Sequence, residues 1–293
     1  MRRLISFFIL FVLLAGCGQK SLPDSVQYLT PLPKQVVQVD DVQLAYRIFG
    51  EGPPLLMIMG YGGTMDLWDA AMIRELSREH TVIIFDNRGM GGSGKGTEEI
   101  SIKRMAADSA GLLRVLGYEQ ADVFGWSMGG LIAQEMTLNY PDKVIKLVLL
   151  GTSCAAQPVE EVTHRLLKMD IQELLSHFFP KGWVEKNPDA LAKLPRQAGP
   201  ADPAVIRAQA DAMIEWEGCC SRLAYLEKPT LIISGLEDDI LPEQLSVQIS
   251  EQVGGSWLVR YKNATHWLMY QDPEGLGSTV NNFLKVKQNL FVH

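Results

Sequence analysis

The sequence predicts an α/β protein: a mostly parallel central sheet flanked by helices, with a helical cap inserted between two halves of the sheet. Two observations carry this prediction. Short, continuous apolar runs alternate with longer segments in which apolar residues recur at helical spacing, as in sheets that are buried on both faces. One long stretch shows helical spacing alone. Strand–helix alternation is typical of a parallel sheet covered by helices, joined by right-handed crossovers.

The N-terminus differs from the rest of the chain. Arg2 and Arg3 precede an apolar run, and small residues lead to Cys17. A basic start, a short apolar run and small residues are typical of an export signal. The run of about 13 residues is shorter than the roughly 20 that a membrane-spanning helix needs. We therefore interpret residues 1–16 as a signal peptide.

The residues before Cys17 resemble a bacterial lipoprotein signal, which reads Leu14-Ala15-Gly16-Cys17 here. The resemblance implies that Cys17 is lipidated, becomes the first mature residue and anchors the protein to a membrane of the cell envelope. Gly18 replaces the aspartate that marks inner-membrane retention in enterobacteria, which favours the periplasmic face of the outer membrane. The alternative is a plain secretory signal with a chance cysteine.

Residues 17–33 are polar and contain three prolines, so they are predicted to form a tether. Apolar and polar residues then alternate on both sides of Asp40 and Asp41, which predicts a β-hairpin. The apolar runs that follow predict six buried strands, at 55–59, 81–85, 121–125, 144–150, 230–234 and 256–261. Helical spacing between them predicts five helices, at 66–78, 102–116, 128–140, 243–251 and 273–283.

The stretch that breaks the alternation lies between the strands predicted at 144–150 and 230–234. It has helical patterns and no convincing strand. We interpret residues 155–226 as the helical cap, and residues 34–154 and 227–288 as the core domain. Trp183, Met213 and Trp216 in the cap either line a substrate pocket or belong to the core.

Charge and cysteine content exclude some functions. The formal net charge is −7 and no basic stripe appears, so nucleic acid is not an expected partner. Cys154, Cys219 and Cys220 show no metal-ligand spacing, and neither a metal nor a cofactor is expected. Adjacent cysteines rarely bond to each other, so a disulfide between Cys154 and one of the other two is possible.

Ser127 is the candidate nucleophile. It lies in the sequence GWSMGG, between a predicted buried strand and a predicted helix, and residues 125–129 fit the pattern G-x-S-x-G. At a strand–helix junction this pattern is typical of a sharp turn that displays a serine hydroxyl above the sheet edge. The glycines avoid collisions with the neighbouring strand and helix, and the helix N-terminus adds a positive dipole.

A serine hydroxyl needs a base to react. His266 follows the last predicted strand and precedes a helix, which places it at the same sheet edge as Ser127. The remaining histidines fall at the opposite edge, in the cap or at the terminus: His80, His164, His177 and His293.

A carboxylate should orient that histidine. The sequence GLEDDILP after a strand offers Glu237, Asp238 and Asp239, and position alone does not decide among them. The order Ser, Asp, His along the chain is the one expected for this kind of fold.

With these residues the chain resembles the α/β-hydrolase superfamily, in its capped group of esterases, enol-lactonases, C–C hydrolases and proline iminopeptidases. The resemblance runs from about residue 36 to residue 284. It rests on the sequences MGYGG, FDNRGMGGS, GWSMGG, GLEDDILP and NATHW.

The resemblance implies roles for individual residues. The acid is Asp238, three residues after Gly235 and four before Pro242. The backbone N–H groups of Tyr61 and Met128 form the oxyanion hole. Many relatives carry histidine where this chain has Met59, which puts the hydrogen bonding of that loop in doubt. Asp86 and Arg88 are expected to form a buried pair rather than to act in catalysis.

Together these residues predict a serine hydrolase that acts on a small acyl substrate, with carboxylic esters favoured, through an acyl-enzyme. A C–C bond hydrolase or a proline-iminopeptidase-like peptidase would share every catalytic residue, so both stay open. A haloalkane dehalogenase or an epoxide hydrolase would need aspartate at position 127. A non-catalytic binding protein is the alternative from another class.

Overall fold

The computed structural model describes residues 33–189, 194–195 and 201–287. The predicted signal peptide, Cys17 and the predicted tether up to residue 32 lie outside the described residues. Within the described part, no helix is both long and apolar enough to cross a membrane.

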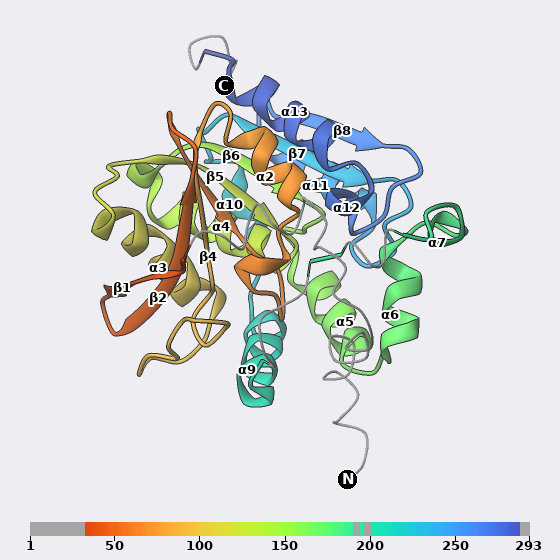
Figure 1. Ribbon diagram of the computed structural model, residues 1–293, viewed down its shortest axis with the longest axis horizontal. Coiled ribbons are helices and arrows are strands. Elements are labelled where there is room, and N and C mark those ends of the chain that lie inside the picture. The colour runs from red at the N-terminus through yellow and green to blue at the C-terminus, as the bar shows by residue number, and fades with distance from the viewer. Residues whose placement is uncertain (1–32, 190–193, 196–200, 288–293) are drawn as a thin grey trace.

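An eight-stranded sheet runs through the centre of the molecule in the order β1-β2-β4-β3-β5-β6-β7-β8 (Figure 1). The first two strands form the predicted antiparallel hairpin, closed at Val39 opposite Val42, and β2 also pairs antiparallel with β4. All later pairings are parallel. The strands are β1 (Gln35–Val39), β2 (Val42–Phe49), β3 (Pro54–Ile58), β4 (Thr81–Phe85), β5 (Ala121–Trp126), β6 (Val144–Leu150), β7 (Thr230–Gly235) and β8 (Trp257–Tyr261).

Helices cover both faces of the sheet, as the alternation predicts. Successive strand residues point to opposite faces. Leu56 belongs to the core cluster on one face, to which α3 (Ile102–Val115), α4 (Met128–Asn139) and α11 (Glu243–Gln252) contribute. Leu55 belongs to the cluster on the other face, to which α2 (Ala70–Leu76), α12 (Leu268–Gln271) and α13 (Pro273–Leu284) contribute. The described residues also form two short 3-10 turns: η2 (Met65–Leu67), which buries Met65, and η3 (Pro141–Lys143), which has no buried residue.

Strand β8 corrects one expectation. Its continuous apolar run predicts burial on both faces, yet β8 is the edge strand of the sheet, and Trp257 is 42% exposed. The sequence pattern does not reveal this because an edge strand loses cover through its place in the sheet, not through its composition.

The described residues between β6 and β7 form helices and no strand. These helices are α5 (Ala156–Leu166), α6 (Ile171–Phe178), α7 (Trp183–Lys186), α9 (Pro203–Ile214) and α10 (Cys220–Leu223). The larger ones, α5, α6 and α9, lie together beyond one end of the sheet, and α5 packs against α9 (Figure 1). We refer to this helical segment as the cap.

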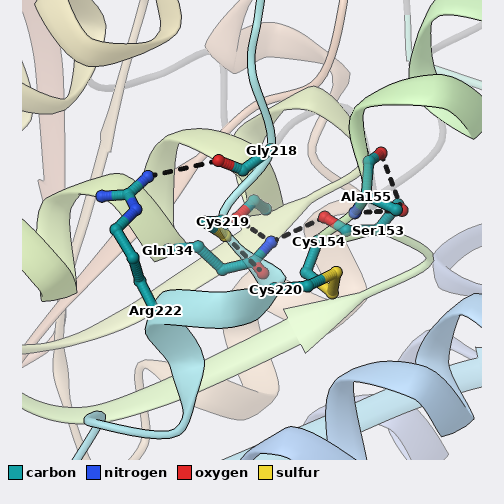
Figure 2. The surroundings of a disulfide bond; sticks show 9 residues. Gln134, Ser153, Cys154, Ala155, Gly218, Cys219, Cys220 and Arg222 are labelled. Carbon is teal, nitrogen blue, oxygen red and sulfur yellow. Dashed lines mark hydrogen bonds between the residues drawn. A yellow bond between two sulfur atoms is a disulfide. The ribbon is translucent and has the colours of Figure 1, made fainter.

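A disulfide between Cys154 and Cys220 joins the beginning and the end of the cap (Figure 2). The carbonyl oxygen of Cys154 also accepts hydrogen bonds from the N–H groups of Cys219 and Cys220, at 2.8 Å and 3.2 Å. Cys219 keeps a free thiol in the core, and burial raises its pKa to about 12. This thiol therefore stays protonated and unreactive at neutral pH.

Helix α4 holds the same junction from the core side. The side-chain amide of Gln134 donates to the carbonyl oxygen of Ser153 at 2.9 Å, within the surroundings drawn in Figure 2. The neighbouring Glu135 accepts hydrogen bonds from the indole of Trp216 at 3.0 Å and from the guanidinium of Arg222. Both ends of the cap are thus fixed to the helix that begins next to Ser127.

Candidate active site

Ser127 stands at the turn between β5 and α4, in a conformation that few non-glycine residues adopt. Its φ and ψ are 55° and −122°, and such a backbone persists only where its surroundings hold it in place. Here the N–H of Ser127 donates to the carbonyl oxygen of Leu150 at 3.0 Å. The carbonyl oxygen of Ser127 accepts from the hydroxyl of Thr152 at 2.9 Å. The end of β6 and the residues directly after it therefore hold the strained turn through both its N–H and its carbonyl group.

The flanking glycines let this turn pack against its neighbours. A Cβ atom on Gly129 would lie 2.0 Å from the carbonyl oxygen of Ile58 in β3. A Cβ atom on Gly125 would lie 2.3 Å from the carbonyl oxygen of Gly129. Any larger residue at either position would push α4 away from the sheet, so the small residues around Ser127 have a steric cause.

The structure brings Ser127, His266 and Asp238 into one hydrogen-bonded chain. Nε2 of His266 lies 3.0 Å from Oγ of Ser127, and Nδ1 lies 2.8 Å from Oδ2 of Asp238. Oδ1 of Asp238 accepts from the N–H groups of Ile240 and Leu241 at 2.9 Å and 3.0 Å. The side chains of these three residues are all buried, and Ser127 is the most exposed of them, at 8%. A carboxylate held in this way can orient the imidazole and stabilise its cationic form.

The neighbours of Asp238 point elsewhere. Glu237 is exposed. Asp239 turns toward the cap, where its Oδ2 lies 2.7 Å from Nδ1 of His177. The structure therefore places Asp238, and neither of the other two acids, against His266.

Aromatic rings surround His266. The indole of Trp126 donates to the carbonyl oxygen of His266 at 3.1 Å, and its ring centroid lies 5.4 Å from the imidazole. Phe178, at the end of α6, stacks on the imidazole with ring centroids 6.0 Å apart. The sequence analysis did not single out Phe178, because nothing in its local pattern separates it from other apolar residues of the cap.

Tyr61 and Met128, the expected oxyanion donors, belong to two segments that border Ser127. Met128 begins α4, so its N–H is one that the helix itself does not satisfy. Tyr61 belongs to the loop 59–63 after β3, which we call the oxyanion loop. A Cβ atom on Gly60 in this loop would lie 3.2 Å from Cβ of Ser127. Burial raises the pKa of the Tyr61 phenol to about 12.

The oxyanion loop has Met59 where many relatives have histidine, and residues from other parts of the chain supply hydrogen bonds to it. The carbonyl oxygen of Met59 accepts from the side-chain amide of Asn87 at 3.1 Å. The N–H of Gly62 donates to Oε1 of Gln209, in the cap helix α9, at 3.0 Å. Gln209 is a further residue that the sequence analysis missed, since its partner lies 147 positions away.

Asp86 and Arg88 are both fully buried, but the expected pair between them is wrong. Arg88 binds Asp108 at 2.6 Å and Asp41 at 3.1 Å. Asp86 instead accepts from the N–H groups of Met65 at 2.7 Å and Gly92 at 2.8 Å. Asp86 and Arg88 therefore bind different segments of the protein. Among the described residues, neither side chain is hydrogen-bonded to Ser127, His266 or Asp238.

Two of the three cap residues considered for a substrate pocket belong to the core. Met213 and Trp216 are 2% and 4% exposed and pack in the cluster around α3 and α4. Trp183 stacks on Phe179 with ring centroids 4.5 Å apart. It lines a cavity of about 490 Å³ together with Lys186 and Tyr270.

In the described part of the chain, no group of three or more His, Cys, Asp or Glu side chains could hold a metal ion.

Comparisons with known proteins agree with this architecture. The chain is 30% identical over 224 residues to the "Putative carbamate hydrolase RutD" of Azorhizobium caulinodans, which covers 73% of this chain and 84% of that protein. It is 29% identical over 254 residues to the 2-hydroxymuconate semialdehyde hydrolase of Pseudomonas sp. strain CF600, covering 80% and 88%.

A thermophilic esterase from Thermogutta terrifontis has the same fold, with a TM-score of 0.76 at 24% identity over 87% of this chain and 98% of the esterase. Both sequence relatives are named as hydrolases, which supports hydrolysis as the reaction class of this protein. Residues 53–273 match the model of the alpha/beta hydrolase fold family, and the chain therefore belongs to that family.

Proposed function

We propose that this protein is a serine hydrolase that cleaves carboxylic esters through an acyl-enzyme. The observation that carries the proposal is the chain from Ser127 through His266 to Asp238, with heavy-atom distances of 3.0 Å and 2.8 Å. These distances are within hydrogen-bond reach of a nucleophile, its base and the group that orients the base.

In the proposed first half-reaction, Oγ of Ser127 attacks the acyl carbon while Nε2 of His266 takes the hydroxyl proton. The carbonyl oxygen of the ester becomes an oxyanion, which accepts hydrogen bonds from the N–H groups of Tyr61 and Met128. The intermediate then collapses, the bond to the alcohol breaks, and His266 returns its proton to the leaving alkoxide. Loss of one such oxyanion donor typically costs about 100- to 1000-fold in rate.

In the second half-reaction, water attacks the acyl carbon of the ester on Ser127. His266 takes a proton from this water and returns it to Oγ as the acid leaves. Asp238 keeps its charge throughout and stabilises the imidazolium at each step. Because Ser127 and His266 are buried next to apolar rings, few water molecules compete for the hydrogen bonds of the intermediate.

A C–C bond hydrolase is the second candidate, and the relative named 2-hydroxymuconate semialdehyde hydrolase favours it. A carbamate substrate is favoured by the other named relative, and a proline-iminopeptidase-like activity would use the same residues. A panel separates these: p-nitrophenyl esters of increasing chain length, a p-nitrophenyl carbamate, a vinylogous diketone and an aminoacyl arylamide. The esters should give the highest kcat/KM; faster cleavage of another member would assign the substrate class to it.

The nucleophile can be tested without knowing the substrate. A fluorophosphonate probe should label the wild-type protein on Ser127, and the label should disappear in Ser127→Ala while circular dichroism shows an intact fold. Persistent labelling of the variant would place the nucleophile elsewhere. A protein that is never labelled and hydrolyses nothing would be a non-catalytic binding protein.

We also propose that the protein is exported and anchored through lipid on Cys17. The disulfide between Cys154 and Cys220 supports export, because such bonds form and persist in oxidising compartments. More than one acyl chain gives stable membrane anchoring. Membrane fractions should therefore contain the wild-type protein, and Cys17→Ser should move it to the soluble or unprocessed pool. A wild-type protein that is soluble after export would contradict the anchor.

A further inference from the structure

Gln209 is a cap residue whose side chain reaches the oxyanion loop. It lies on α9 and is fully buried. Its Oε1 accepts the N–H of Gly62 at 3.0 Å. Its Nε2 is also buried and has no hydrogen-bond partner among the described residues. The bond to Gly62 is thus the one hydrogen bond found for this carboxamide there, and it joins the cap to the loop that carries Tyr61.

The peptide that Gln209 holds is next to the one that matters for catalysis. Gly62 directly follows Tyr61, whose N–H is the proposed oxyanion donor. Gly62 has a φ of +68°, a conformation that glycine enters and leaves easily. Within the loop, the turn bond from the N–H of Gly63 to the carbonyl oxygen of Gly60 is long, at 3.3 Å. An outside acceptor on Gly62 therefore restrains the direction of the neighbouring Tyr61 N–H.

Helix α9 is placed to act as this anchor. A Cβ atom on Gly62 would be in ordinary contact with Ile206, at 3.4 Å, one turn before Gln209. Val205 packs so closely on Gly89 that a Cβ atom there would lie 2.7 Å away. The helix thus rests on two loops of the core, and its position fixes where the carboxamide of Gln209 lies.

The hydrogen bond to Gly62 is partly shielded from water, because Gln209 is fully buried and Gly62 is partly buried. An N–H that loses its acceptor in such surroundings costs free energy, and the loop would move to find another partner for it. Met59 offers a thioether, only a weak hydrogen-bond acceptor, as a side-chain substitute within the loop.

We propose that Gln209 is a positioning residue that makes the oxyanion hole depend on the cap. Oε1 of Gln209 holds the Tyr61–Gly62 peptide so that the Tyr61 N–H points at the developing oxyanion. The oxyanion hole is complete when α9 lies on the oxyanion loop. A displaced α9 misdirects the Tyr61 N–H while the hydrogen bonds from Ser127 through His266 to Asp238 remain. This inference rests on the proposed function, because it assigns Gln209 to the same acyl-transfer site.

The test compares Gln209→Met, which keeps the length and apolar volume of the side chain but removes the acceptor, with Met213→Leu, which changes the core packing of the same helix α9 and keeps the acceptor. Each is measured with an activated p-nitrophenyl ester and with a trifluoromethyl ketone that forms an oxyanion on the serine. Active sites are counted by fluorophosphonate labelling, so that misfolded molecules do not enter kcat.

Gln209→Met should lower kcat per labelled site by about 10- to 100-fold, because misplacing a catalytic group by about 1 Å can cost about 100-fold. The affinity for the ketone should fall by the same factor, while KM changes little. Met213→Leu should keep both values within about twofold of wild type, because a volume-conserving change in the core is well tolerated.

Unchanged kcat and ketone affinity in Gln209→Met, with a lower melting temperature, would show a purely structural role and overturn the inference. A large rise in KM with kcat unchanged would also overturn it, since it would assign Gln209 to ground-state binding. A wild-type protein that is neither labelled nor active would instead reject the proposed function, and that result is distinct from both.

Discussion

Reduction of the Cys154–Cys220 disulfide should destabilise the protein without unfolding it at room temperature. The bond closes a segment of 66 residues, which contains the cap helices α5, α6, α7 and α9. In the chain-entropy description, a cross-link over a loop of this length reduces the entropy of the unfolded chain enough to stabilise the native state by about 4 kcal/mol at 25 °C. For a domain of this size, that corresponds to a shift of about 8–16 °C in melting temperature.

The native structure indicates that reduction should lower stability by increasing the entropy of the unfolded chain, not by disrupting native contacts. Without the disulfide, the carbonyl oxygen of Cys154 still accepts two backbone hydrogen bonds, and Glu135 still binds Arg222 and Trp216. The junction therefore keeps its shape after reduction. Activity per labelled site should remain close to that of the oxidised protein at 25 °C, while the free energy of unfolding falls.

The assay is urea unfolding followed by tryptophan fluorescence, with and without a phosphine reductant. Cys154→Ala/Cys220→Ala should match the reduced wild type and not respond to reductant. Cys219→Ala is the matched control: it removes the free thiol next to Cys220 and should keep the full response. A difference of less than about 1 kcal/mol between oxidised and reduced wild type would refute the loop-closure argument.

Two further predictions concern buried carboxylates. Asp238→Asn should lower kcat on an activated ester by about 10⁴-fold, and Asp239→Asn should retain most activity because its carboxylate contacts His177 instead; the reverse order would reassign the acid. Burial raises the pKa of Asp122 to about 7, so the native state holds a proton that the unfolded state releases above about pH 4. The contribution of Asp122 to stability should therefore fall as pH rises from about 4 to 7, by up to about 1.4 kcal/mol per unit. Wild type and Asp122→Asn should differ by this slope in urea titrations, and equal slopes would contradict the prediction.

The sequence by itself determined the order of the elements and the edge at which the candidate site forms. Continuous apolar runs give strands and helical spacing gives helices, because each period reflects which faces of a local segment meet the core. Ser127 and His266 each follow a parallel strand, and the carboxyl ends of such strands share one edge. The glycines around Ser127 are required by steric crowding at the turn, so their role could also be predicted from the sequence.

Only the tertiary structure decided which distant residues touch. It chose Cys220 over Cys219 as the partner of Cys154, and it put Met213 in the core instead of a pocket. It brought Phe178 onto the imidazole of His266 and Gln209 onto Gly62. No local pattern encodes these contacts, because a period along the chain states which face of a segment is buried but not which other segment, 66 or 147 positions away, covers it.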